Sequence, residues 1–228
     1  MATLAALRPT PVAHVTGVPI LSAMELTKRQ AELADAALGI VGRDGMAAVT
    51  FRSVAAASGC SLGAVQKAFH SKEELLGAMF ARLRAATGAV PPGEPGRPTL
   101  RSWLTDLMLG MLPVDDRRRA LTLQASAFSE RAAFDAATGE AIRASDDQIR
   151  GLLAQLVERA KAEDEVSSEV DADQAAWSYL ALAQGLAAQL LYDPHPEDEV
   201  RGRVHLAVAG LLPQPTRSAD ARLVGEAL

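Results

Sequence analysis

The 228-residue sequence contains one cysteine, Cys60, and its aromatic side chains make up only 4% of the chain. A single cysteine excludes an intramolecular disulfide and is consistent with the reducing cytoplasm, where we expect the protein to reside. The sequence has no run of roughly 18 uninterrupted apolar residues, so we expect no membrane span. It also lacks runs of alternating β-branched residues bounded by turns, and we therefore predict no strand.

The residues that are abundant favour helix. Hydrophobic residues make up 49% of the chain and charged residues 22%, which is ordinary for a globular protein. Alanine and leucine dominate the apolar fraction, and both are strong helix formers. The four histidines show no metal-ligand spacing and no phosphate-binding glycine loop is present, so we predict neither a metal nor a cofactor (His14, His70, His195 and His205).

The most informative stretch is a pair of short helices between residues 50 and 70. Thr50 is a good N-cap for a helix that begins at Phe51, because its hydroxyl can accept a hydrogen bond from an otherwise unpaired N–H. Gly59 follows, where a helix end favours a residue that tolerates positive φ. Ser61 then caps a second helix. Two short helices joined by a tight glycine turn are typical of a helix-turn-helix, whose second helix enters the major groove of DNA.

Two longer helices are predicted on either side of this pair. The first places Leu33 and Leu38 on an apolar face before Gly45. The second begins at a capping box formed by Ser71 and Glu74, in which each side chain satisfies a backbone donor. Together these elements predict an N-terminal DNA-binding head that includes a linking helix, over residues 25–87.

These residues carry a resemblance to a known family. The stretch from residue 27 to residue 87 resembles, without a gap, the DNA-binding domain of the TetR family of one-component transcriptional regulators. The resemblance rests on Gly45, Thr50, Val54, Ala55, the run Gly59-Cys60-Ser61-Leu62-Gly63, the run Phe69-His70-Ser71-Lys72-Glu73 and Leu76. Two positions depart from the family pattern: Gln66 stands where an aromatic residue is usual, and Ala68 where histidine is frequent.

The head supplies the predicted DNA contacts. Gln66 can pair with adenine and Lys67 with guanine or a phosphate, whereas Arg52 is placed to bind the backbone. The N-terminus of the second helix favours a phosphate, and Leu62, if exposed, meets a thymine methyl group. The full set of predicted DNA-binding residues is Thr50, Arg52, Ser61, Leu62, Gly63, Ala64, Gln66, Lys67, His70 and Lys72.

The distribution of charge supports this assignment. Residues 25–86 carry 8 Lys and Arg against 6 Asp and Glu, whereas residues 87–228 carry 14 against 22. The chain as a whole is acidic, with a formal net charge of −5, but its basic part coincides with the helix-turn-helix. Because the head is only weakly basic, we expect two heads to act together on double-stranded DNA.

The composition also marks domain boundaries. Residues 1–24 contain three prolines after one arginine, and we interpret them as a disordered extension. Residues 88–98 contain four prolines and three glycines, and they predict a loop before a helical body over residues 99–213. Residues 214–228 are predicted to be a flexible tail. The predicted fold class is therefore all-α, with a helix-turn-helix head followed by a helical ligand-binding and dimerisation domain.

The body shows strong apolar stripes, the last two of which suggest an interface. The predicted helix over residues 172–192 is apolar on nearly all sides, and another follows over about 197–212. This segment resembles the closing part of TetR-family effector domains, so we expect these two helices to form a homodimer interface. Large apolar residues and two isolated glutamines are candidates for an effector pocket (Trp103, Leu107, Met108, Met111, Gln124, Phe128, Trp177 and Gln184), although large apolar residues at helical spacing usually form core.

The resemblance implies a ligand-responsive repressor that binds a near-palindromic operator as a homodimer and is released by an unknown small molecule. A ligand-independent regulator or an activator of the same fold is the alternative. Gly59-Cys60-Ser61-Leu62-Gly63 also matches the G-x-S-x-G elbow of hydrolases, with Asp193 and His205 following, but that site requires a strand before Ser61. We therefore predict no enzyme. Cys60 is interpreted as a core residue of the turn, with a redox sensor as the less favoured reading.

Overall fold

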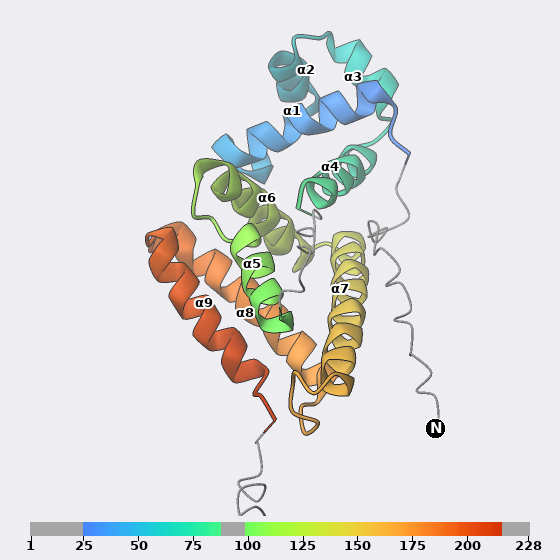
Figure 1. Ribbon diagram of the computed structural model, residues 1–228. Coiled ribbons are helices and arrows are strands. Elements are labelled where there is room, and N and C mark those ends of the chain that lie inside the picture. The colour runs from blue at the N-terminus through green and yellow to red at the C-terminus, as the bar shows by residue number, and fades with distance from the viewer. Residues whose placement is uncertain (1–24, 88–98, 216–228) are drawn as a thin grey trace, which may run out of the picture.

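The computed structural model describes residues 25–87 and 99–215, and every regular element in these ranges is helical (Figure 1). The expectations for residues 1–24, for the 88–98 loop and for residues 216–228 lie outside the described residues. The elements are α1 (Lys28–Asp44), the 3-10 turn η1 (Met46–Ala48), α2 (Phe51–Ser58), α3 (Leu62–Ala68), α4 (Lys72–Thr87), α5 (Leu100–Met111), α6 (Asp116–Ala132), α7 (Ala136–Ala162), α8 (Ala172–Tyr192) and α9 (Glu197–Leu211).

Polar caps set the ends of the head helices. The Thr50 hydroxyl accepts from the Ser53 N–H at 3.0 Å and begins α2, and the Ser61 hydroxyl accepts from the Ala64 N–H at 3.2 Å and begins α3. Between them, Gly59 ends α2 with φ of 65°, in the left-handed region that favours glycine. The predicted helix-turn-helix is therefore confirmed at residue level.

Aspartates cap the body helices in the same way. Asp115, Asp135 and Asp171 accept backbone N–H bonds at the starts of α6, α7 and α8. A carboxylate at these positions also interacts favourably with the helix dipole. Helix α6 extends to Ala132, and α7 begins at Ala136, after the Asp135 cap.

The capping box predicted at the start of α4 needs correction. Ser71 accepts from the Glu74 N–H at 3.1 Å, but the Glu74 carboxylate accepts from the His70 N–H at 2.8 Å rather than from the Ser71 N–H. The basic run at residues 117–119 makes contacts within the chain. Arg118 donates to the Leu109 carbonyl and pairs with Glu197, so it ties the start of α9 to the end of α5.

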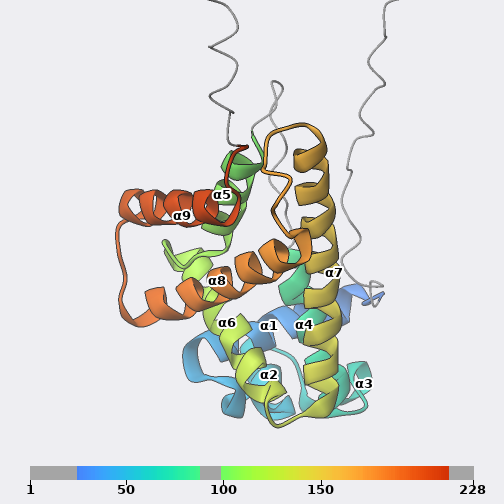
Figure 2. The same cartoon turned by 90° about the horizontal axis from the view of Figure 1, so that it is seen from below.

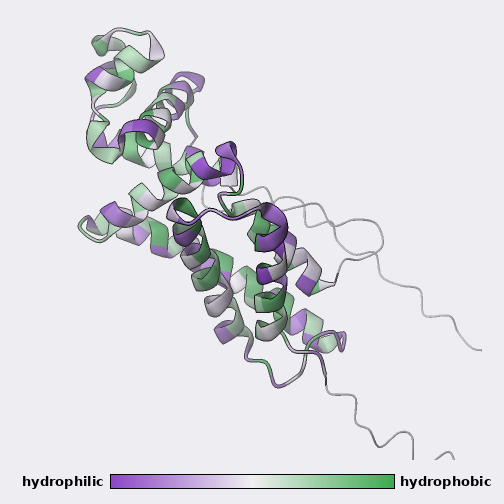
Figure 3. Cartoon of the chain, turned by 90° about the vertical axis from the view of Figure 1, so that its left-hand side faces the viewer, coloured by the Kyte–Doolittle hydropathy of each residue, from purple (hydrophilic) through white to green (hydrophobic). Residues whose placement is uncertain are grey.

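The helices form two apolar cores. One, the head core, is built by α1 to α4 and receives Phe128 from α6; the other, the body core, is built by α5, α7, α8 and α9. Helices α1 to α4 lie above the body in Figure 1, and α7 runs along one side of the body, upright in the orthogonal view of Figure 2. Long hydrophobic stretches run along the body helices (Figure 3). None of the helices in the described ranges is long and apolar enough to cross a membrane.

Candidate DNA interface and its connection to the body

Helix α3 presents one face to the head core and the other to solvent. Val65 and Phe69 are fully buried and anchor α3 on α1, α2 and α4. Gln66 and Lys67, on the opposite side, are exposed. The side chains predicted to read bases are therefore available to a DNA groove, as the i, i+4 spacing of the two buried residues required.

The first turn of α3 is open as well. Leu62 is 36% exposed, and a Cβ atom added to Gly63 would have no other atom within 4 Å. Nothing inside the chain therefore requires glycine at position 63. The absence of a side chain instead leaves room for a close approach from outside, next to the N–H groups at the start of the helix.

The predicted flanking contacts differ in how available their side chains are. Arg52 on α2 and Lys72 on α4 are exposed. The Thr50 hydroxyl is already engaged with Ser53, and the His70 ring lies 3.3 Å from the Glu74 carboxylate. Arg52 and Lys72 thus remain the cations that are most available to phosphates among the predicted flanking contacts, whereas Thr50 and His70 contribute to local structure.

The side chain of Gln30 holds the C-terminal end of α3 by a hydrogen bond that the sequence did not predict, and we call this contact the Gln30 clamp. The Gln30 Nε2 donates to the Ala68 carbonyl at 3.0 Å, and the Gln30 Oε1 accepts from the Thr27 N–H at 3.1 Å. The last carbonyls of a helix have no partner within the helix, so this bond fixes the C-terminal end of α3 to the start of α1. The sequence signal was only the Thr27-x-x-Gln30 capping box.

Glu74 fixes the chain just after α3. Its carboxylate accepts from the His70 N–H and lies within 3.3 Å of the His70 Nδ1. The hydrogen bond from the His70 N–H, with a smaller contribution from the His70 ring, lowers the pKa of the Glu74 carboxyl. The carboxylate thus stays ionised and holds the turn between α3 and α4 at neutral pH.

The head is joined to the body through α1, α4 and α6. Arg82 of α4 forms a bidentate pair with Asp35 of α1, with both N···O distances 2.8 Å. The Phe80 ring of α4 lies 5.4 Å from the Phe128 ring of α6. The buried Gln124 Nε2 of α6 donates to the Leu38 carbonyl of α1 at 3.0 Å. Helix α6 therefore contacts both helices that support the reading head.

The residues predicted to line an effector pocket do not surround one space. Met108 is buried in the body core, and Trp103, Leu107 and Met111 pack against it. Phe128 belongs to the head core and Gln124 lies at the junction of α6 with α1. Trp177 and Gln184 are exposed on α8.

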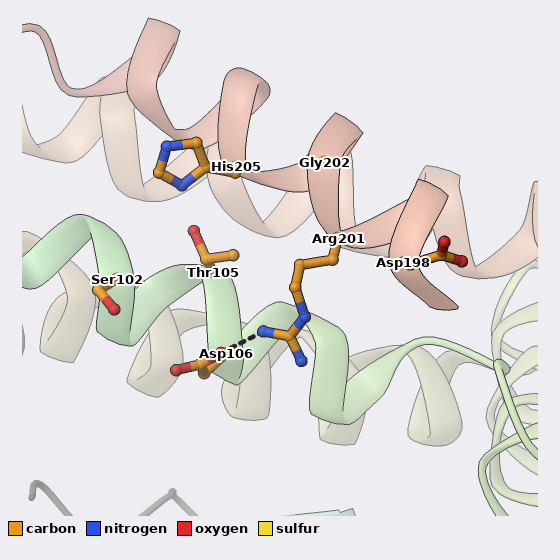
Figure 4. A pocket seen from close by; sticks show the side chains of 7 residues that line it. All are labelled: Ser102, Thr105, Asp106, Asp198, Arg201, Gly202 and His205. Atoms are coloured by element: carbon orange, nitrogen blue, oxygen red, sulfur yellow. Dashed lines mark hydrogen bonds and ion pairs between the residues drawn. The ribbon is translucent and has the colours of Figure 1, made fainter. Parts of the chain in front are cut away.

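The body core is tightly closed in this structure. A space among Leu104, Tyr179, Val208 and their neighbours has a volume of about 10 Å³, which is too small for an organic ligand. A larger hollow of about 460 Å³ lies between α5 and α9, where an Asp106–Arg201 ion pair of 2.8 Å crosses it (Figure 4). It is lined by Ser102, Thr105, Asp106, Asp198, Arg201, Gly202 and His205, none of which was predicted.

An uncovered apolar face runs along α8 and continues on α9. Trp177 and Tyr192, at opposite ends of α8, are 55% and 79% exposed, and Leu206 of α9 is 73% exposed. The exposed positions of α8 between the two aromatic residues include Ala181 and Ala188, which are small. One face of α8 is therefore open in the single chain.

No hydrolase site is present at Ser61. The residues before it form helix α2 rather than a strand, and the Ser61 hydroxyl caps α3. Within the described residues, no group of three or more His, Cys, Asp or Glu side chains is arranged to hold a metal ion.

The comparisons with known proteins agree with this architecture. Residues 33–79 match the family model described as bacterial regulatory proteins of the tetR family, and residues 98–213 match the BetI-type transcriptional repressor C-terminal model. A search of curated proteins finds no match.

Solved structures share the fold. A transcriptional regulator from Rhodococcus sp. Rha1 superposes with a TM-score of 0.71 at 24% identity, covering 81% of this chain and 96% of the other. Salmonella enterica GusR gives 0.67 at 20% identity, covering 82% and 98%. The multidrug binding protein EbrR, complexed with imidazole, gives 0.57 at 23% identity, covering 84% and 98%.

The BetI-type match alone spans half of the sequence, and the tetR-family match falls on the helix-turn-helix described above. The chain therefore belongs to the TetR family of bacterial transcriptional regulators, which are DNA-binding proteins and not enzymes, and its C-terminal domain is of the BetI repressor type.

Proposed function

We propose that the protein is a homodimeric repressor that binds a near-palindromic operator through two copies of α3 and leaves it when a small molecule binds the body. The observation that carries the DNA-reading part is the orientation of α3. Its buried Val65 and Phe69 leave Gln66 and Lys67 exposed, next to an open helix N-terminus.

The roles of individual residues follow from their chemistry. The Gln66 amide can donate to and accept from adenine, and the Lys67 ammonium can donate to guanine or a phosphate. Arg52 and Lys72 bind backbone phosphates and set the register without reading sequence. The clamp made by Gln30 keeps α3 at a fixed angle for this purpose.

The dimer is supported by the open face of α8 and α9. Exposed Trp177, Tyr192 and Leu206 present large apolar area, while the small residues Ala181 and Ala188 allow a second helix to approach. A two-fold axis through this face gives an isologous four-helix contact. Two heads related by this axis would read half-sites about one helical turn apart.

A ligand can release the DNA only if it binds two arrangements of the head with different affinities. Helices α1 and α4 contact α6 through the Gln124–Leu38 bond and the Phe80–Phe128 pair. A ligand that displaces α6 or α7 therefore shifts the supports of α3. In a dimer, a small shift of each head changes the distance between the two reading helices.

A ligand-independent regulator of the same fold is favoured by one observation, the closed body core with its 10 Å³ space. A single experiment distinguishes the ligand-responsive repressor from the ligand-independent regulator. The purified chain is titrated onto the DNA upstream of its own gene in a mobility-shift assay, with and without a metabolite panel. A retarded band that one metabolite abolishes supports the ligand-responsive repressor, whereas a band that no metabolite changes supports the alternative. The absence of any sequence-specific band contradicts both.

A further inference from the structure

The feature that this structure leaves unexplained is a set of buried polar atoms without partners. Among the described residues, four buried side-chain atoms have no hydrogen-bond partner: Arg84 Nε, Gln124 Oε1, Arg131 Nε and Ser145 Oγ. Buried polar groups in folded proteins are nearly always hydrogen-bonded, so each such atom requires a reason.

Two of these residues stand out among the buried polar side chains. Four polar residues are buried in the described structure, and the hydroxyls of Thr105 and Thr122 both donate to the carbonyl one helical turn earlier. Ser145 is 1% exposed and makes no such bond. Gln124 is 9% exposed; its Nε2 is fixed by the Leu38 carbonyl, so the free atom is the acceptor Oε1.

Helix geometry brings these groups to one level. Helices α6 and α7 pack together and run antiparallel, because only residues 133–135 separate them. Phe128 of α6 and Ile142 of α7 both belong to the head core. Gln124 lies one turn before Phe128, and Ser145 lies about one turn after Ile142. Both residues are therefore about one helical turn further from the α6–α7 turn than Phe128 and Ile142, in the direction of the body core.

Charged and polar residues from two other helices extend this level. Asp146, next to Ser145, accepts from the Gln184 Nε2 of α8 at 3.3 Å. Arg84 of α4 lies close enough to Asp146 for electrostatic attraction, which offsets part of the pKa decrease that burial causes in the guanidinium. We call these five residues the polar layer (Arg84, Gln124, Ser145, Asp146 and Gln184). Gln184 is the exposed member of this set and Asp146 is half-buried, whereas Ile149 and Leu153, further along α7, pack in or against the body core.

The chemistry of the polar layer defines a complementary group. The unpaired Arg84 Nε is a hydrogen-bond donor and the unpaired Gln124 Oε1 is an acceptor. The Ser145 hydroxyl can act as donor or acceptor. The formal charges of Arg84 and Asp146 cancel, so an additional buried charge would have no counterion and would be costly. An uncharged group that both donates and accepts satisfies the free atoms without that cost.

We propose that the polar layer recognises the hydrogen-bonding end of the effector, and that this end is an uncharged amide or hydroxyl group on an otherwise apolar molecule. This inference rests on the ligand-responsive function proposed above. The apolar remainder packs against the adjoining body core, whose helices must separate to admit it. Because α4 contributes to the layer, binding acts directly on the helix that leaves the reading head.

The proposal is tested with three probes that share one alkyl chain: hexanamide, hexanoate and hexylammonium. Binding to the full chain is measured by isothermal titration. Hexanamide is expected to bind at least about tenfold more tightly than either ion, because neither charge is compensated in the layer. The Ser145→Ala variant is expected to weaken hexanamide binding about fivefold, whereas Ser129→Ala, at an exposed position of α6, leaves it unchanged.

Three results overturn the proposal: no measurable binding of hexanamide, equal binding of an ion, or equal binding by Ser145→Ala and wild type. The melting temperature of the unliganded protein gives a second measurement. Ser145→Ala should raise it by about 2–4 °C, since alanine removes a buried unpaired hydroxyl. A decrease shows that the hydroxyl is already satisfied and also overturns the proposal.

A parallel shift assay on upstream DNA separates this proposal from the proposed function. If the protein binds that DNA and a metabolite releases it equally from wild type and Ser145→Ala, the polar-layer proposal fails and the repressor stands. If the unliganded protein binds no DNA specifically, the proposed function itself fails.

Discussion

Gln30 and Ala68 are joined by a hydrogen bond of 3.0 Å from the Gln30 Nε2 to the Ala68 carbonyl, which connects the first turn of α1 with the last turn of α3. The two residues are 38 positions apart, and the bond joins the start of the domain to the end of the reading helix. Its consequence is that the angle of α3 depends on a residue that need not touch DNA.

Replacing Gln30 should therefore weaken DNA binding. Gln30→Leu removes the donor and is expected to lower operator affinity about fivefold, since an intramolecular hydrogen bond contributes about 1 kcal/mol. Gln30→Glu keeps an acceptor for the Thr27 N–H but cannot donate to Ala68, so it should be at least as damaging. Fluorescence anisotropy with labelled operator measures both variants.

The matched control is Glu32→Gln, on the same exposed stretch of α1, where the side chain pairs only with Arg29. Its affinity should equal that of wild type. If Gln30→Glu retained full affinity, the bond to Ala68 would not position the reading helix.

Gln66 and Lys72 should affect DNA binding in different ways. Gln66→Ala removes a base contact and should reduce the preference for operator over unrelated duplex, at about 1–3 kcal/mol for a good bidentate pair. Lys72→Ala removes a phosphate contact and should weaken binding to every duplex and reduce the salt dependence by about one unit of slope. Titrations at several salt concentrations separate the two effects, and identical behaviour of the variants contradicts the assignment.

The open face of α8 and α9 should control oligomeric state. Tyr192→Glu combined with Leu206→Glu places two charges on the proposed interface and should convert the dimer to a monomer in sedimentation velocity. Phe134→Glu is the control, because Phe134 is 90% exposed in the turn between α6 and α7. A dimer that survives the double substitution would place the interface elsewhere.

A buried tyrosine forms a hydrogen bond inside the body core. Tyr179 is buried and its hydroxyl donates to the Leu104 carbonyl at 2.7 Å, while burial strongly raises the pKa of the phenol. Tyr179→Phe removes the hydroxyl at nearly constant volume. We expect a loss of about 1 kcal/mol, which lowers the melting temperature by about 2–4 °C. An unchanged melting temperature in differential scanning calorimetry would show that this bond contributes nothing net.

Much of the head was predictable because its signals are local. Thr50, Gly59 and Ser61 act through backbone groups within three residues, and their types suffice to locate both helix ends and the turn. The exposure of Gln66 and Lys67 followed from the i, i+4 spacing of Val65 and Phe69.

The remaining features depend on contacts between distant segments. The Gln30 clamp requires knowledge that Ala68 lies beside the start of α1, and a glutamine in the first turn of a helix gives no such direction. Gln124 illustrates the same limit: its polarity suggested a pocket, but its amide donates to the Leu38 carbonyl on another helix. Apolar positions such as Met108 cannot be divided into core and pocket by periodicity, because both require the same spacing.

The most direct test of the central claim is the stoichiometry of the operator complex by native mass spectrometry, measured for wild type and for a variant with both Gln66→Ala and Lys67→Ala. We predict two chains on one operator duplex for wild type and, under the same conditions, loss of the specific complex for the double variant. A single chain per duplex, or an undiminished complex with the double variant, would contradict the account of a dimer that reads DNA with α3.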